Sequence, residues 1–154
     1  MVEYAGFWRR FLALLIDSLV LSIGLSTVFF VLGIFMVLTL GVGAIGSDET
    51  VTDIAVVINI MLSFIGFIIA FIVQWLYFAI MESSSKQATL GKMAIGIKVT
   101  DLDGNRISFG RATGRYFAKI LSAMIFYIGF FMAGWTKEKQ ALHDMIAGTL
   151  VVKD

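Results

Sequence analysis

The sequence predicts an all-α integral membrane protein with two full transmembrane helices, a third membrane-embedded helical segment and a small cytoplasmic β-hairpin. Of its 154 residues, 59% are hydrophobic and only 15% are charged, whereas a soluble domain carries about 25% charged residues. Two apolar runs each exceed the roughly 20 residues that cross a bilayer. Because no linker or internal repeat divides the sequence, residues 1–154 are expected to form a single membrane domain.

The first expected span covers residues 11–40. This run is apolar apart from Asp17 and a few hydroxyl groups, and about 30 residues are more than enough to cross the hydrocarbon core. Arg9 and Arg10 precede it, as basic residues precede a secretory signal, but the apolar core of a signal is only about 7–15 residues long. A retained, tilted helix therefore fits better than a cleaved leader.

The second expected span covers residues 54–81. It carries no formal charge, and it follows an expected loop, residues 41–53, whose charged residues are all acidic. Trp75 lies near the end of this span and Trp8 lies near the start of the first one. Both positions suit the membrane interface, where tryptophan is enriched.

A basic segment, residues 82–119, comes next. It holds seven Lys and Arg residues against three acids, so the positive-inside rule places this segment and the N-terminus in the cytoplasm. Within it, residues 97–100 and 107–109 flank Asp103 and Gly104. An Asp-Gly turn between two short apolar runs predicts a β-hairpin.

The third membrane segment, residues 120–135, is short for a complete crossing. A complete crossing would place Lys137, Lys139 and Lys153 outside the cell, against the charge rule. A re-entrant hairpin around Gly129 would return the tail to the cytoplasm and is favoured. A short transmembrane helix is the alternative.

The C-terminal segment, residues 139–152, is expected to be amphipathic and to contain a short helix that Gly148 caps. His143 and Asp144 are adjacent within it, and His143 is the only histidine of the chain. A lone histidine could sense pH near neutrality. An ordinary interfacial pair with Asp144 is favoured over that role, and no metal site or cofactor is expected.

Asp17 is the strongest candidate for a functional residue. It lies inside an apolar run, where a carboxylate costs several kcal/mol unless it is paired. Arg10 is seven residues earlier, on nearly the same helix face and about 10 Å away along the axis, so its side chain could reach toward Asp17. The alternative is that Arg10 extends to the interface while Asp17 only stabilises helix packing.

Two further polar residues of the spans have two possible roles each. Ser18 begins a stripe of serines at i, i+4 spacing, and Gln74 lies in the second span. Such residues most often allow helices to approach closely or join them by hydrogen bonds, and a hydroxyl-lined ion path is the alternative. Neither residue decides the function alone.

Several blocks of sequence resemble the RDD family of small membrane proteins. They are residues 4–11 with Ile16 and Asp17, residues 88–93 and residues 142–144. The resemblance covers nearly the whole chain, and the Arg and two Asp residues that name the family correspond by position to Arg10, Asp17 and Asp144, with Arg9 as an alternative to Arg10. It implies transport, since some members are linked to sodium/proton exchange, whereas eukaryotic relatives are partners within membrane quality-control assemblies.

The functional hypothesis is cation/proton exchange, in which a proton and a small cation such as sodium compete for Asp17 with Asp144 nearby. Arg10 would hold the unloaded carboxylates. Two or three spans are few for alternating access around a midplane site, so a homo-oligomer is expected. The alternative is a membrane scaffold without transport activity, in which the basic segment docks a partner and the Arg and Asp residues fix helix packing.

No enzymatic activity is expected, because the chain has no cysteine, a single histidine and no G-x-S-x-G motif. The bilayer is the expected partner, with a small cation and the proton as substrates, and no nucleic acid is expected to bind. The resemblance implies a bacterial plasma membrane.

Overall fold

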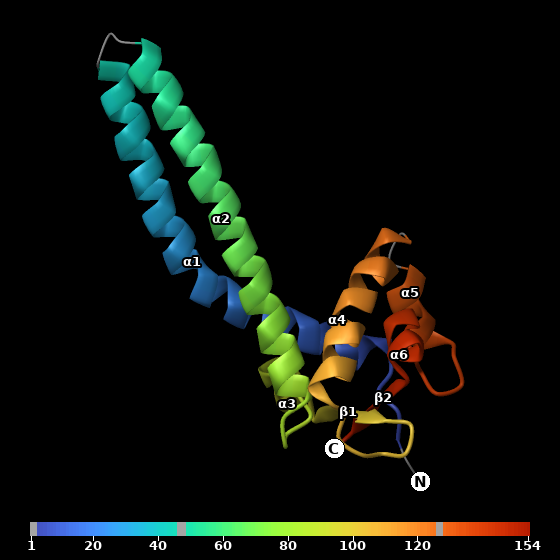
Figure 1. The fold of residues 1–154 in the computed structure, drawn as a ribbon. Helices are drawn as coiled ribbons and strands as arrows, with labels where there is room; N and C mark the ends of the chain where they lie inside the picture. Colours follow the sequence, from blue (N-terminus) through green and yellow to red (C-terminus); the bar gives the residue numbers. More distant parts are fainter. Residues whose placement is uncertain (1–2, 46–48, 126–127) are drawn as a thin grey trace. The chain divides into compact units, whose positions relative to one another are not determined.

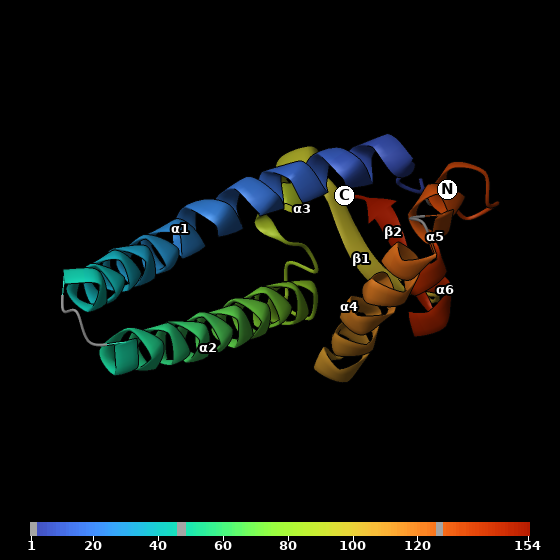
Figure 2. The same cartoon turned by 90° about the horizontal axis from the view of Figure 1, so that it is seen from above.

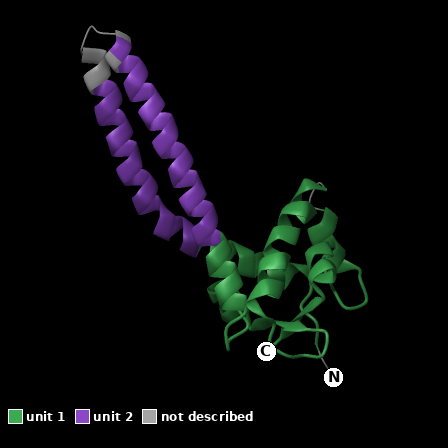
Figure 3. Cartoon of the chain, viewed as in Figure 1, with its two compact units in different colours: residues 1–19, 75–154 green, residues 20–74 purple. Residues whose placement is uncertain are grey.

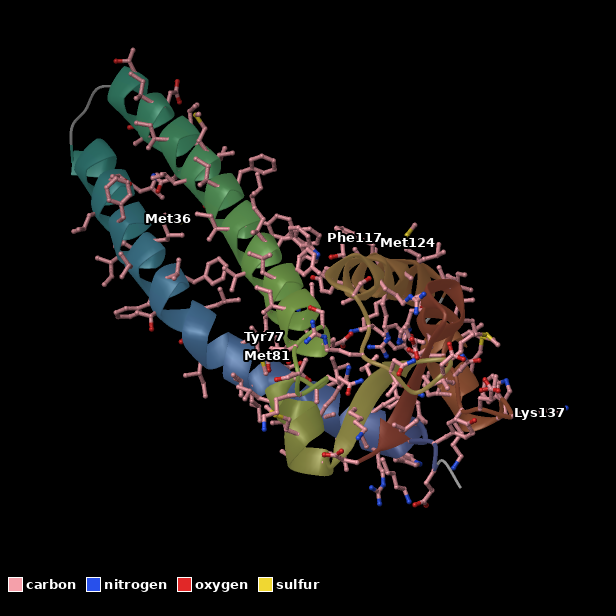
Figure 4. The ribbon with its side chains drawn as sticks, turned by 60° about the horizontal axis from the view of Figure 1, so that its bottom comes forward. Met36, Tyr77, Met81, Phe117, Met124 and Lys137 are labelled. Carbon is pink, nitrogen blue, oxygen red and sulfur yellow. The ribbon has the colours of Figure 1, made fainter. Side chains whose placement is uncertain are left out.

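The computed structural model describes residues 3–45, 49–125 and 128–154, and it is mostly helical (Figure 1). The elements in chain order are α1 (Phe7–Ile45), α2 (Glu49–Glu82), α3 (Leu90–Ile95), β1 (Ile97–Asp101), α4 (Phe109–Met124), α5 (Ile128–Phe131), the 3-10 helix η1 (Met132–Gly134), α6 (Leu142–Ala147) and β2 (Thr149–Lys153). They form two compact units, residues 20–74 and residues 1–19 with 75–154 (Figure 3).

The two predicted spans are confirmed as long apolar helices. Phe7–Gly41 and Thr52–Glu82 are 35 and 31 residues long and apolar enough to cross a membrane. The expected loop, residues 41–53, was too long, because α1 continues to Ile45 and α2 begins at Glu49. Glycine in a helix costs only about 1 kcal/mol relative to alanine, so Gly41 and Gly43 did not end the helix. Residues 46–48 of the expected loop lie outside the described part.

The unit formed by residues 20–74 is an antiparallel pair of helices, which run side by side in Figures 1 and 2. Its outer surface is apolar: the side chains of Ile23 and Val37 are 72% and 71% exposed, as suits contact with lipid. Between the helices, the Asn59 amide donates to the Thr39 hydroxyl oxygen at 2.8 Å. Gly66 faces Leu32 so closely that an added Cβ would lie 2.8 Å from its side chain. Small and polar residues thus join the pair, as is usual in membranes.

The other unit is built on a two-stranded antiparallel sheet. β1 pairs with β2, with Val99 opposite Val151, and both valines are fully buried. The N-terminal residues extend this sheet, since the Ala5 amide donates to the Val151 carbonyl oxygen at 2.8 Å. Around it, a small core gathers buried side chains from most elements of the unit: Ala5, Ala13, Ala79, Ile97, Val99, Ile107, Ala112 and Val151.

The predicted β-hairpin is wrong in its second strand. The first strand and the turn are confirmed, since the Asp101 carboxylate accepts from the Asp103 and Asn105 amides at 3.0 and 2.7 Å. However, the Ser108 hydroxyl accepts from the Arg111 amide at 3.2 Å and so caps α4, which directs residues 108–109 into a helix instead of a strand. The more apolar segment Thr149–Lys153 pairs with β1 instead.

The third apolar segment is a bent pair of helices. α4 begins at Phe109, well before the predicted residue 120, and the chain bends by 116° before continuing from Ile128 to Gly134. The bend precedes Gly129, which lies in α5 against α4: an added Cβ would lie 2.8 Å from that of Ser122. Counted as one element, the two helices are long and apolar enough to cross a membrane. Whether it is re-entrant or crosses the bilayer stays a prediction.

The C-terminal segment, residues 139–152, contains the predicted short helix. α6 ends at Gly148, which has the left-handed φ of 59° that favours glycine at a helix end. Residues after it turn into β2 and are buried in the sheet. The predicted basic segment, residues 82–119, correspondingly contains α3, β1 and the first turns of α4.

Candidate functional site

Arg115 joins two buried acids near the sheet. From α4, its Nη1 donates to Glu82 Oε2 at 2.7 Å, and its Nη2 and Nε donate to Asp144 Oδ1 at 2.6 and 2.8 Å. The three side chains are at most 2% exposed. Burying an ion is favourable only with good geometry and full pairing, so this guanidinium is the centre of an ion-pair cluster.

Two lysines complete the surroundings of Glu82. Lys92, at the beginning of α3, pairs with Glu82 Oε1, and Lys119 Nζ lies 3.4 Å from the same oxygen. Burial, with Arg115 nearby, lowers the pKa of Lys92 to about 7, although Glu82 opposes this shift. Lys92 can therefore gain or lose a proton near neutral pH.

Arg10 approaches the cluster from α1. Its Nη1 pairs with Asp144 Oδ2, its Nε donates to the Ala5 carbonyl oxygen at 2.9 Å and its Nη2 to the Lys139 carbonyl oxygen at 2.6 Å. Arg9, the alternative to Arg10 in the sequence analysis, is exposed. Arg10 and Asp144, two of the three residues that the resemblance indicated, thus meet within the chain.

Asp144 is held ionised by its neighbours. Burial alone would raise its pKa, but the Arg115 and Arg10 guanidinium groups hold the pKa of this carboxyl well below its usual range. Its Oδ2 also accepts from the Ala141 amide at 3.1 Å, which stabilises the first turn of α6. Asp144 is therefore a fixed negative charge between two guanidinium groups.

Asp17 is buried, as expected for a functional acid, but it binds a different set of groups. Its Oδ1 accepts from the Tyr77 hydroxyl and from the Gly91 amide, each at 2.7 Å, and its Oδ2 accepts from the Thr89 hydroxyl at 2.6 Å. These contacts join α1 to the end of α2 and to the start of α3. Asp17 therefore has the environment of a residue that holds helices together by hydrogen bonds.

The predicted contact between Arg10 and Asp17 is not among the described hydrogen bonds and ion pairs. Helical side chains lean toward the N-terminal end of their helix, so Arg10 extends toward Ala5 and away from Asp17. The three-residue cluster expected from the sequence is thus divided between two places. Arg10 and Asp144 share one, and Asp17 occupies the other.

The supporting residues differ in position. Ser18 is exposed and donates to the Leu14 carbonyl oxygen at 2.8 Å within its own helix, and Gln74 is exposed and belongs to the other unit. His143 is buried, with Nε2 at 3.5 Å from Asp144 Oδ1 and Nδ1 at 3.4 Å from Ser122 Oγ. Among these, only His143 adjoins the cluster, and it has the ordinary pairing with Asp144 that the sequence favoured.

Burial makes His143 a source of acid instability. It lowers the pKa of His143 to about 3 from an ordinary 6.5, so between these values the unfolded chain binds more protons and stability falls as the pH falls. From pH 6.5 to 5 we expect a loss of roughly 1.5 kcal/mol from this group. Melting temperatures in detergent should show it, and His143→Gln should flatten the pH profile. A wild-type profile already flat over this range would contradict the assignment.

Sequence reasoning missed Glu82, Lys92, Arg115 and Lys119 as members of a site. A signal existed for α4: Arg115 is three residues after Ala112 and seven before Ser122, both buried, so it shares the buried face of the helix. The pattern can be recognised only when the helix is known to begin at Phe109, because the predicted segment began at residue 120 and left Arg115 outside it. Glu82 gave no comparable signal, since it reads as the polar end of a span.

A cavity of about 420 Å³ borders the cluster within the same unit. Four cationic side chains contribute to its wall: Arg10, Lys92, Arg115 and Lys119. The His143 imidazole, whose pKa burial lowers, lines it as well. Asp17 is the only acid among the described residues that line it, and its oxygens already accept three hydrogen bonds. The rest of the wall is largely aromatic and aliphatic: Phe7, Phe11, Leu14, Phe78, Phe130 and Phe131.

Two helices with the length and apolarity of membrane spans, together with a buried cluster of acids and bases, define a helical membrane protein with an internal ion-pair network. The chain belongs to the RDD family, whose model matches residues 4–148. No solved structure gives a significant match.

Relatives with curated sequences occur in two bacteria. The chain is 39% identical to the uncharacterized protein YxaI of Bacillus subtilis (strain 168) over 154 residues, 99% of each chain. It is 34% identical to the uncharacterized membrane protein YteJ of the same organism, covering 98% of this chain and 82% of that protein. The uncharacterized protein RP437 of Rickettsia prowazekii (strain Madrid E) is 37% identical over 84 residues, 54% of this chain and 42% of that protein.

Proposed function

We propose that this chain is a membrane transport protein that exchanges a proton for a small cation such as sodium at the Glu82–Lys92 pair. The observation that carries the proposal is the buried contact of the Lys92 ammonium with Glu82 Oε1. The proposed pair does not include Asp17, which the sequence had suggested, although Asp17 and Lys92 line the same cavity. Asp17 instead keeps α3, and hence Lys92, in place.

The exchange follows from competition for one carboxylate oxygen. When the Lys92 ammonium releases its proton, it becomes a neutral amine with a free lone pair, and Glu82 loses one of its positive partners. A small cation can then bind between the amine and the carboxylate. One positive charge leaves as another arrives, so the net charge of the cluster is unchanged, and reprotonation of Lys92 expels the cation.

The titration of Lys92 supports a cycle at physiological pH. Its pKa of about 7 means that the ammonium predominates below neutrality and the amine above it, so cation uptake is expected to increase with pH across this range. Alternating access with two or three spans needs further helices, and a homo-oligomer is part of the proposal. The bacterial relatives support a plasma-membrane location, with the N-terminus and the basic segment in the cytoplasm by the charge rule.

Lys92→Arg tests the proposal, because arginine keeps the positive charge but does not lose its proton at physiological pH. In proteoliposomes with an internal pH dye, a sodium gradient should drive proton flux through the wild-type protein, and Lys92→Arg should reduce this flux at least tenfold. Lys98→Arg is the matched control, since Lys98 pairs with Asp154 at the surface. It should leave the flux unchanged.

A scaffold without transport activity is the second candidate, favoured by one observation. The cluster's acids are saturated by its bases, and Asp17 by three donors, as in a purely structural network. Wild-type proteoliposomes without proton flux in sodium, potassium or lithium gradients would establish this candidate and exclude exchange. Gel filtration of Lys92→Arg, with Lys92→Gln as a second variant, shows whether any lost flux reflects misfolding.

A further inference from the structure

We propose that the cavity beside the cluster binds a long-chain anionic amphiphile of the fatty-acid class, with the carboxylate at the basic wall and the chain against the aromatic wall. The inference goes beyond ion exchange and does not depend on it. It rests on the two contrasting walls of one cavity and on the charge count of the groups around it.

The basic wall carries more positive charge than its acids balance. Four bases surround the two acids of the cluster: Arg10, Lys92, Arg115 and Lys119 around Glu82 and Asp144. The bases line the cavity, and Asp17 is the only acid among the described residues that line it. With Asp17 included, four positive charges face three negative ones. An anion in the cavity would therefore meet one uncompensated positive charge among largely buried side chains, where such an interaction is strong.

Lys119 is the base best placed to hold the anion. Its distance to Glu82 Oε1, 3.4 Å, is longer than that of a strong charge-assisted hydrogen bond. Its Nζ also lies 4.3 Å from the centroid of the Phe78 ring, so it stands where the basic wall meets the aromatic wall. An ammonium donates three hydrogen bonds, and this one has donors left for a carboxylate.

The aromatic wall fits a hydrocarbon chain. Phe7 and Phe131 stack with centroids 4.9 Å apart, and both line the cavity with Phe11, Phe78 and Phe130. A volume of about 420 Å³ lies within the range of small-molecule sites, which are mostly apolar with a few polar groups that fix orientation. A small inorganic anion would leave this wall unfilled, whereas a single-chain amphiphile uses both walls.

The experiment measures retention of radiolabelled palmitate by the purified full chain on gel filtration in an uncharged detergent. Palmitate is expected to co-elute and to be displaced by unlabelled palmitate, but not by hexadecanol, which lacks the charge, or by acetate, which lacks the chain. No ion gradient is present, so this result is independent of proton flux. Displacement by hexadecyl phosphate at a concentration at least tenfold below that needed with unlabelled palmitate would overturn the carboxylate assignment and indicate a lipid phosphate group.

Variants of Lys119 test the anchor. Lys119→Gln is expected to weaken palmitate binding at least tenfold and Lys119→Arg to retain it, because only the second keeps the positive charge. Lys98→Gln, a surface lysine in an ion pair with Asp154, is the matched control and should bind like the wild type. Equal binding by Lys119→Gln, equal displacement by hexadecanol or no retention of palmitate at all would each overturn the proposal.

Discussion

Arg115→Gln is expected to destabilise the protein by about 3–5 kcal/mol, the usual cost of removing one partner from a buried ion pair. Glu82 and Asp144 are each at most 1% exposed and would both lose a guanidinium. Glutamine is too short to reach both carboxylates and carries no charge to balance them. The acids would then be left to partners that are already engaged.

Melting in detergent, followed by gel filtration of the heated sample, measures this effect. Arg111→Gln on the same helix is the control, because the Arg111 side chain is 46% exposed and lies 3.9 Å from Asp101. A surface pair of this kind contributes at most about 1 kcal/mol. If the two variants melted together, the ion-pair cluster would not hold this unit together as described.

Gly91→Ala is expected to have an effect of similar size for a steric reason. A Cβ at Gly91 would lie 2.1 Å from the Ala13 carbonyl oxygen and 2.9 Å from Asp17 Oδ1. The nearest atom belongs to the backbone of α1 and cannot rotate aside, so α3 must move away. Overpacking costs about 1–3 kcal/mol, and the lost hydrogen bond from the Gly91 amide adds about 1–3 kcal/mol for a buried acceptor.

Gly114→Ala in α4 is the matched control for Gly91→Ala. No atom lies within 4 Å of an added Cβ there, and alanine in a helix interior is about 0.5–1 kcal/mol better than glycine. The two substitutions should therefore shift the melting temperature in opposite directions. A Gly91→Ala protein that melts like the wild type would show that α3 does not pack on α1 as described.

Hydropathy was sufficient to predict the long helices, because lipid selects for apolar length and little else. A small antiparallel sheet was expected and is present, but the partner of β1 was not predicted. β1 had two apolar candidates for a partner, and the nearer one continues into α4 after the cap at Ser108. The true partner, Thr149–Lys153, is about fifty residues distant along the chain. Long-range pairing of this kind depends on the core, where Val99 and Val151 meet, and not on local pattern.

The candidate site was predictable in part for a related reason. A charge inside an apolar run is conspicuous, which identified Asp17 as buried, and the family resemblance identified Arg10 and Asp144. Arg115 and Lys92 lie in a basic segment that reads as a solvated cytoplasmic face, although both are buried. A buried positive charge can be recognised from the sequence only when its acidic partner is known. The partner of both residues is Glu82, which is ten residues from Lys92 and thirty-three from Arg115.

The sheet places constraints on biosynthesis. Ala5 and Glu3 form hydrogen bonds with the backbone of Val151 and Lys153, so residues that leave the ribosome early pair with residues made about 150 positions later. The segment around Ala5 therefore stays unpaired until β2 has been synthesised. During that interval, membrane insertion of the two long helices can proceed, and the ion pairs of Asp144 with Arg10 and Arg115 can form only after α6 has been synthesised.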